Sequence, residues 1–191
     1  RVTNYTQILR KTFSSSYTQD EVQKAGVGGS EFDHQRMLKT KELARDMNAA
    51  LINQSSASGD SASARTLNGV LTAITTNTAA GNSQIISQNI VNATLQTIWT
   101  AGGRPNAIYV NGYNKRAISN WTNPLHRNID ANGKKLVVAV DTYDSDFGVQ
   151  MIIPEREMPA AQIAILEEKY WKTGFLRPLF FEETGKVGGQ R

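Results

Sequence analysis

The sequence predicts an α+β fold, and three observations support this class. The stretch Ser30–Ile52 carries apolar residues at roughly helical spacing. Short runs rich in β-branched and aromatic residues, such as Ala107–Val110, have the composition of strands. Helical and strand patterns alternate along the chain without the regular βαβ rhythm of a parallel α/β sheet. The fold class therefore follows from element type and order.

Length and composition narrow the function classes. The chain has 191 residues, which suits one domain or two small ones with a real core. Its net charge is +4, and positive and negative residues nearly balance in every quarter, so it lacks the basic patch of a tight nucleic-acid binder. The absence of cysteine excludes disulfides and thiolate chemistry. No apolar run approaches the roughly 20 residues of a membrane span.

The first fifty residues predict a strand followed by a long helix. Residues 1–18 have strand composition, but neither alternating face is clearly apolar, so this strand needs a partner outside the segment. At the helix start, Ser30 and Asp33 fit a capping box. The apolar stripe that we expect to face inward consists of Phe32, Leu38, Leu43, Met47, Ala50 and Leu51.

The remaining elements are predicted by the same reasoning. Residues 53–82 are polar with almost no charge and indicate a loop, with weak structure around 67–74. A second amphipathic helix covers Gln84–Thr100 with Ile90, Val91, Leu95, Ile98 and Trp99 inward, and Gly102 and Gly103 end it. The further elements are strands at 107–110, 136–143, 149–153, 163–167 and 175–182, and a short helix at 113–121.

No motif for catalysis is present. The two histidines, His34 and His126, are the candidates for a Ser-His-Asp arrangement, but the sequence contains no GxSxG elbow. We therefore predict that the chain is not an enzyme and has no catalytic residues. Both histidines are assigned to a surface or interface.

Two motifs suggest a ligand without matching a known site. The run DTYDSD (141–146) clusters carboxylates, but a calcium loop needs Gly and Glu where Asp146 and Ile152 stand. The run GVGG (26–29) precedes a helix, yet it lacks the GK[ST] ending of a phosphate loop. A polar turn and a flexible joint are the simpler interpretations, so we predict no metal and no cofactor.

Two further patterns suggest contacts outside the chain. The long helix carries Arg36, Lys39, Lys41 and Arg45 among acidic residues, which indicates either a solvated face or contact with DNA or a neighbouring subunit. The run LRPLFF (176–181) places Pro178 inside a predicted strand. Proline is tolerated at sheet edges, so the run indicates an edge strand whose aromatic residues lack a partner.

Three segments carry a resemblance to a known family. They are NYTQILRKTF (4–13), AGGRPNAIYVNGYNKRAISNWT (101–122) and YWKTGFLRPLFFEETGK (170–186). In this order they closely resemble one group of tailed-bacteriophage major capsid proteins with the Hong Kong 97-type fold, and the resemblance runs along nearly the whole chain. It implies an α+β capsid fold with a projecting β-loop, a long spine helix, a peripheral domain and an axial domain.

The resemblance also implies a domain organisation. Residues 1–29 are then the return strand of the projecting loop and its joint, and residues 30–63 the peripheral domain with the spine helix. Residues 64–165 form the axial domain, and residues 166–191 return to the peripheral domain. The family's N-terminal arm, the first strand of its projecting loop and a strand after the TGK run are expected to lie outside this chain.

The function implied is that of a major capsid protein that assembles into hexamers and pentamers of an icosahedral or prolate shell around double-stranded DNA. The expected partners are other copies of the chain, packaged DNA through weak non-specific contact, and scaffolding, portal and decoration proteins, with no membrane. The expected location is the virion, after assembly in the host bacterial cytoplasm. Two alternatives stay open: an encapsulin-like compartment shell and a serine hydrolase.

Contacts between copies are expected from charged and large apolar side chains, because ion pairs at an interface rim can fix the register of identical subunits. The candidate residues are Tyr5, Ile8, Arg10, Phe13, Arg36, Trp121 and Phe180.

Overall fold

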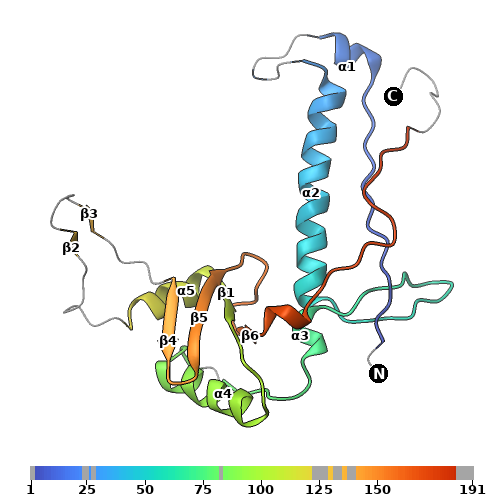
Figure 1. The fold of residues 1–191 in the computed structure, drawn as a ribbon. Helices are drawn as coiled ribbons and strands as arrows, with labels where there is room; N and C mark the ends of the chain where they lie inside the picture. Colours follow the sequence, from blue (N-terminus) through green and yellow to red (C-terminus); the bar gives the residue numbers. More distant parts are fainter. Residues whose placement is uncertain are drawn as a thin grey trace. The chain divides into compact units, whose positions relative to one another are not determined.

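The computed structural model divides into two compact units, each with its own architecture (Figure 1). Unit 1 comprises residues 1–69 and 174–191, and unit 2 comprises residues 70–173. Helices and strands are both present, which confirms the α+β class. The residues that the structure describes are 3–22, 26, 29–81, 84–121, 129–130, 135–136 and 141–183.

Unit 1 is built on one long helix. Helix α2 (Glu31–Asn53) has 23 residues and confirms the helix predicted at 30–52, and the short helix α1 (Tyr17–Glu21) precedes it. The predicted capping box is wrong, because Ser30 makes no side-chain capping bond. Asp20 of α1 replaces it: one carboxylate oxygen accepts from the Ser30 hydroxyl (2.7 Å) and from the Phe32 amide (3.2 Å). A carboxylate is the stronger acceptor for an unpaired amide at a helix start.

Helix α2 is poorly covered within its own unit. Among its 23 residues only Glu31 and Ala50 are buried. The prediction that Leu38 faces inward is wrong, since 43% of it is exposed, and its neighbour Met37 is exposed as well. In the described part of unit 1, no sheet and no second long helix is present to cover this face.

Two predicted strands are absent from unit 1. Residues 3–15 and 174–183 have no regular secondary structure, and both run alongside α2 (Figure 1). The strands predicted at 1–18 and 175–182 are therefore wrong over their described residues, and Tyr17 begins α1. A strand needs a hydrogen-bonded neighbour, and no described segment pairs with either one. The bend just before Pro178 likewise removes the predicted edge strand.

The loop after α2 closes back on the helix end. An isolated antiparallel bridge joins Ala57 to Thr66, and the Gly69 amide donates to the Gln54 carbonyl at 2.7 Å. A Cβ on Gly69 would lie 2.7 Å from the Gln54 nitrogen, so only glycine fits without a shift. Helix α3 (Val70–Ala73), within the region of weak structure expected from the sequence, begins unit 2.

Helix α4 (Gln88–Thr100) lies in unit 2 and starts four residues later than predicted, because Ser87 caps it by accepting from the Ile90 amide. It ends in a Schellman motif, as the Gly-Gly pair predicted. The Gly102 amide donates to Trp99 and the Gly103 amide to Ile98, with φ of +88° at Gly102. Trp99 was predicted to face inward, but 59% of it is exposed.

The sheet of unit 2 has the strand order β4-β5-β1-β6, with bounds β1 (Ala107–Val110), β4 (Thr142–Ser145), β5 (Gly148–Pro154) and β6 (Ala164–Leu166). Strand β1 is parallel to β5 and antiparallel to β6, and β4 is antiparallel to β5. The strands predicted at 107–110, 149–153 and 163–167 are confirmed.

Three shorter elements complete unit 2. Helix α5 (Gly112–Ser119) confirms the predicted short helix, and a 3₁₀ turn, η2 (Glu168–Tyr170), follows β6. Strands β2 (Ile129–Asp130) and β3 (Lys135–Leu136) form a separate pair. The strand predicted at 136–143 is therefore divided between β3 and β4, and residues 137–140 of that prediction lie outside the described residues.

The core of unit 2 lies between helices α4 and α5 and the central strands. Ile108 and Val110 of β1 and Ile152 of β5 are at most 3% exposed, as are Val91, Leu95 and Ile118 of the helices. Ile86, Trp121, Tyr143, Phe147, Ile163 and Ile165 pack around this cluster. Unit 2 thus carries a conventional hydrophobic core.

Candidate assembly interface

Exposed apolar side chains gather on the two segments of unit 1 that lack secondary structure. We call residues 3–15 and 174–183 the unit 1 strip. The following side chains of the strip are each at least 46% exposed: Tyr5, Ile8, Phe175, Leu176, Leu179, Phe180 and Phe181. Large exposed apolar side chains concentrated on two segments in this way make the strip a candidate interaction surface.

The N-terminal part of the strip is held to α2 by charge. The Lys11 ammonium lies 2.9 Å from Glu42 Oε1 and 2.6 Å from Asp46 Oδ2, while Lys39 lies 2.7 Å from the other Glu42 oxygen. Lys39 and then Lys11 lower the pKa of Glu42 to about 2, and Asp46 and then Glu42 raise the pKa of Lys11. These groups are partly exposed, so the ion pairs fix the position of the segment along α2 more than they stabilise the fold.

The same segment is also joined to the loop after α2. The Asn4 side chain accepts from the Asn68 amide at 2.7 Å and donates to the Asn68 carbonyl at 3.2 Å. Arg65 Nε donates to the Thr6 carbonyl at 2.8 Å. All three contacts are exposed, and each such bond contributes only about 0.5–1.5 kcal/mol net.

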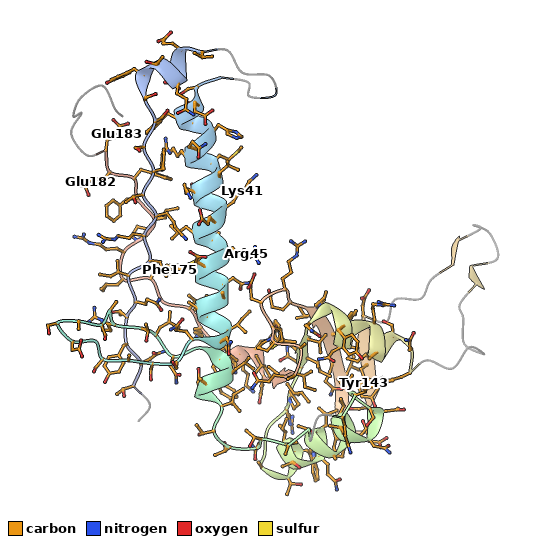
Figure 2. All side chains as sticks on the ribbon, turned by 180° about the vertical axis from the view of Figure 1, so that it is seen from behind. Lys41, Arg45, Tyr143, Phe175, Glu182 and Glu183 are labelled. Atoms are coloured by element: carbon orange, nitrogen blue, oxygen red, sulfur yellow. The ribbon has the colours of Figure 1, made fainter. Side chains whose placement is uncertain are left out.

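The C-terminal part of the strip is attached more lightly. The Arg36 guanidinium lies 4.0 Å above the Phe181 ring, a contact of about 0.5–1 kcal/mol when exposed. Among the described residues, the backbone of 174–182 makes no backbone–backbone hydrogen bond. Figure 2 shows Phe175 and Glu182 on the strip side of α2, and Lys41 and Arg45 on the opposite side. Residues 174–182 therefore combine a backbone that lacks backbone–backbone hydrogen bonds with exposed apolar side chains.

The structure places six of the seven candidate contact residues in unit 1. Tyr5, Ile8 and Arg10 are exposed on the strip, and so is Phe180. Phe13 is half-buried, with its ring 5.1 Å from that of Phe32, and Arg36 covers Phe181. Trp121 lies in unit 2, edge-on to Tyr143 at 6.1 Å and packed against the core. Their contact with another copy stays a prediction.

Sequence reasoning missed the two polar residues that organise unit 1. Lys11 meets its partners 31 and 35 positions along the chain, and Asp20 acts on residues 10 and 12 positions away. Both separations exceed the helical spacing that charge-pattern rules recognise. Local capping and charge patterns do not reach over separations of this size, so neither contact had a signal in the sequence.

Unit 2 has a polar clip of its own between β1 and η2. The Tyr109 hydroxyl donates to Glu168 Oε1 at 2.6 Å, and the Asn106 amide donates to Glu168 Oε2 at 2.9 Å. Burial, followed by the bond to Glu168, raises the pKa of Tyr109 to about 12. Nearby, Lys169 pairs with Glu167. This geometry fixes the position of the chain after β6.

The motifs for which a catalytic or metal site was considered lie as follows. His34 lies in the first turn of α2, and His126 lies outside the described residues. Of the carboxylates of 141–146, Asp141 precedes β4, Asp144 lies within β4 and Asp146 lies in the turn before β5. Within the part of the chain that the structure describes, no group of three or more potential ligands is placed to hold a metal ion. Over that same part, no helix combines the length and apolarity needed to cross a bilayer.

Comparison with known proteins gives one family. The family described as SU10 major capsid protein matches residues 1–191, the whole of the sequence. A comparison with curated proteins found no match.

Proposed function

The chain belongs to the SU10 major capsid protein family, and from this premise we propose that it forms a Hong Kong 97-type shell. In this proposal, copies assemble into hexamers and pentamers of an icosahedral or prolate shell that encloses double-stranded DNA. Membership of the family by itself gives the general role. The chain is a structural protein of the virion, associates with copies of itself in the shell, and is not an enzyme.

The observation that carries the proposal is the unit 1 strip. Its seven exposed apolar side chains lie beside a helix in which only Glu31 and Ala50 are buried. Fully burying one side chain of this size contributes about 1.5–3 kcal/mol, so covering even part of the strip repays much of the cost of association. The nearly balanced charges favour interfaces whose register is fixed by ion pairs.

The capsid domains are proposed to correspond to the two units. Unit 1 joins residues 1–69 to residues 174–191, which supports a grouping of projecting loop, spine helix and returning peripheral segment, although the sequence placed the bounds of these parts at 1–63 and 166–191. Unit 2, with its own sheet and core, is assigned to the axial domain. The long α2 supports its assignment as the spine helix.

Contact with DNA is proposed to be sparse and independent of base sequence. The exposed Lys41 and Arg45 lie on the side of α2 away from the strip and are interleaved with Glu42 and Asp46 (Figure 2). Few neutralised phosphates give a shallow salt dependence, since each contributes about −0.9 to the log–log slope. Scaffolding, portal and decoration proteins are the further proposed partners, with assembly in the host bacterial cytoplasm.

The family assignment does not favour the two alternatives, an encapsulin-like compartment and a serine hydrolase. The contents of purified particles separate the two shell functions: double-stranded DNA supports the capsid, and an enclosed enzyme supports the compartment. Labelling of the intact chain by a serine-reactive probe would support the serine hydrolase alternative.

The test is assembly of the full chain, scored by negative-stain electron microscopy. We expect closed shells with sixfold and fivefold capsomers, and we expect Phe180→Asp to lower particle yield by at least about tenfold, which is 1.4 kcal/mol of association free energy. Tyr113→Asp places the same charge on an exposed aromatic residue of α5 and is the matched control. If Phe180→Asp gave particles at wild-type yield, the strip would not be part of the interface. If the wild-type chain stayed monomeric, the proposed shell would be refuted.

A further inference from the structure

Helix α2 has a second exposed face, on the side away from the unit 1 strip. At about 3.6 residues per turn, four side chains fall within roughly a third of the helix circumference. They are Met37, Leu38, Lys41 and Arg45, and all four are exposed. Figure 2 shows the two cations of this group on the side of α2 opposite the strip. We call these four residues the α2 basic face.

The acidic residues of the same stretch of helix lie elsewhere on its surface. Glu42 and Asp46 are on the strip side, where both bind Lys11. No acidic residue lies three or four positions from Lys41, so this cation has no partner at helical ion-pair spacing. The composition of the α2 basic face therefore favours an acidic partner from outside the helix.

The outer face of the β4–β5 hairpin carries the opposite charge. In the strand register Asp144 lies opposite Val149, and Thr142 lies opposite Met151. Gln150, between the two apolar residues, is fully buried, so strand alternation turns Val149 and Met151 away from the core. They are 60% and 56% exposed, and Asp144 is exposed beside them. We call Asp144, Val149 and Met151 the hairpin acidic face.

The two faces have matching patterns. On α2, Lys41 lies one helical turn from both exposed apolar residues, at about 5–6 Å between Cβ atoms. On the hairpin, Asp144 lies about 4.5–5.5 Å from Val149 and about 7–8 Å from Met151 on the diagonal. Each face thus places a charge next to a pair of exposed apolar side chains, and the two charges have opposite sign.

We propose that the hairpin acidic face of one copy docks on the α2 basic face of a neighbouring copy, with Asp144 against Lys41 and the two apolar pairs in contact. The inference rests on the proposed assembly of copies into a shell and names one of its interfaces. The opposite charges fix the register, and the apolar pairs supply buried area. Because the two patches differ, the contact is heterologous and can close into a ring.

DNA is the other occupant that a basic helix face can take. Phosphates would pair with Lys41 and Arg45, but they would leave the exposed Met37 and Leu38 in water. A protein surface with its own apolar pair covers all four residues, which favours a second copy of the chain. A neighbour's carboxylate on Lys41 also leaves fewer cations for phosphate, in keeping with the sparse DNA contact proposed above.

Charge reversal tests the pairing in the full chain. Lys41→Glu and Asp144→Lys should each lower particle yield by at least about tenfold, because like charges then face each other. The double variant should recover most of the yield, since it restores opposite charges in exchanged positions. Lys172→Glu and Glu21→Lys reverse exposed charges elsewhere and should assemble as the wild type does. The melting temperature of the free chain should stay unchanged in every variant, as expected of exposed positions.

Crosslinking identifies the partner, and the absence of native cysteine simplifies it. One preparation carries Ala44→Cys, a turn from Lys41, and another carries Thr142→Cys on the hairpin; both positions are exposed. In shells assembled from an equal mixture, a short bismaleimide should link residue 44 to residue 142, as identified by mass spectrometry of the peptides. Each chain holds one cysteine, so this link joins two copies. Ala160→Cys, exposed elsewhere in unit 2, is the control and should form no link to residue 44.

The outcomes separate this contact from the shell itself. Closed shells without the 44–142 link, or a double variant no better than the single ones, would overturn the contact and leave the shell intact. If Lys41→Glu lowered only the DNA content of the shells, the α2 basic face would be a DNA contact instead. Oligomers that carry the link but never close into shells would contradict the proposed function alone, and a chain that stays monomeric would contradict both.

Discussion

Among the described residues, 11 apolar side chains are buried, of which 10 lie in unit 2 and one, Ala50, lies in unit 1. Unit 2 surrounds strands β1 and β5 with side chains from α4 and α5. Unit 1 joins its segments largely through polar contacts that are exposed or only partly buried: the Lys11 ion pairs, the Asn4–Asn68 bonds and the Asp20 cap. One unit is built like a small globular domain and the other is not.

This difference has a physical meaning for a shell protein. A buried Leu or Ile contributes about 1.5–3 kcal/mol, whereas an exposed ion pair contributes about 0–1 kcal/mol. The interactions within unit 1 therefore offset little of the conformational entropy that is lost when its chain is ordered. Its apolar strip meanwhile stays exposed. Our central claim is that other copies of the chain supply the missing cover.

The largest effect is expected from the core of unit 2. Leu95→Ala removes a side chain that is fully buried, and it should lower the free energy of unfolding by about 2–5 kcal/mol. Leu179→Ala, in the strip, should change it by less than about 0.5 kcal/mol. Urea denaturation followed by circular dichroism measures both. Equal losses would mean that unit 1 has a core of its own.

The next effect tests a tightly packed point in the backbone of unit 1, at Gly69. Gly69→Ala forces a Cβ to within 2.7 Å of the Gln54 nitrogen and should cost about 1–3 kcal/mol through overpacking at the end of α2. Gly81 has nothing within 4 Å of its Cβ position, so Gly81→Ala is the control and should be neutral or slightly stabilising. A neutral Gly69→Ala would show that the loop after α2 moves freely, which would widen the contrast between the units.

A smaller effect is expected at the start of α2. Asp20→Ala removes the shared acceptor of Ser30 and Phe32 and should cost about 0.5–2 kcal/mol, the usual value of a helix cap. Hydrogen exchange at the Phe32 amide should accelerate in parallel. The neighbouring exposed Glu21→Ala is the control. Unchanged exchange at Phe32 would show that Asp20 does not hold α1 to α2.

The smallest effect concerns pH. The pKa of Glu42 is lowered from 4.5 to about 2, so its ion pairs contribute fully above pH 4.5 and are lost as the pH falls through 2. The attachment of residues 3–15 to α2 should weaken over that window. In a carboxyl NMR titration, Lys39→Met and Lys11→Met should each raise the pKa of Glu42, while Glu168 of unit 2 should titrate as before. A Glu42 pKa that neither variant moves would contradict the ion-pair geometry.

The sequence predicted unit 2 better than unit 1, for a physical reason. Strands β1, β5 and β6 and helix α5 lie where composition and turn signals placed them, because their partners are inside the chain. The segments 3–15 and 175–182 have strand composition but no strand in the chain to pair with, so propensity alone misassigned them.

The candidate interface was predictable only in part. Aromatic residues in the LRPLFF run suggested a missing partner, and Phe180 is indeed exposed. Trp99 was predicted to face inward because it adjoins the apolar stripe of α4. In the structure only Val91 and Leu95 of this helix are buried. The attachment of Lys11 to Glu42 and Asp46 depends on tertiary contact, which no local spacing reveals.

Amide hydrogen exchange of the free chain and of assembled shells tests the central claim most directly. We expect the amides of residues 3–15 and 174–183 to exchange rapidly in the free chain and to become protected on assembly, with β1 and β5 protected in both states. Protection of the strip in the free chain equal to that of β1, or rapid exchange of the strip in complete shells, would contradict the claim that other copies cover unit 1.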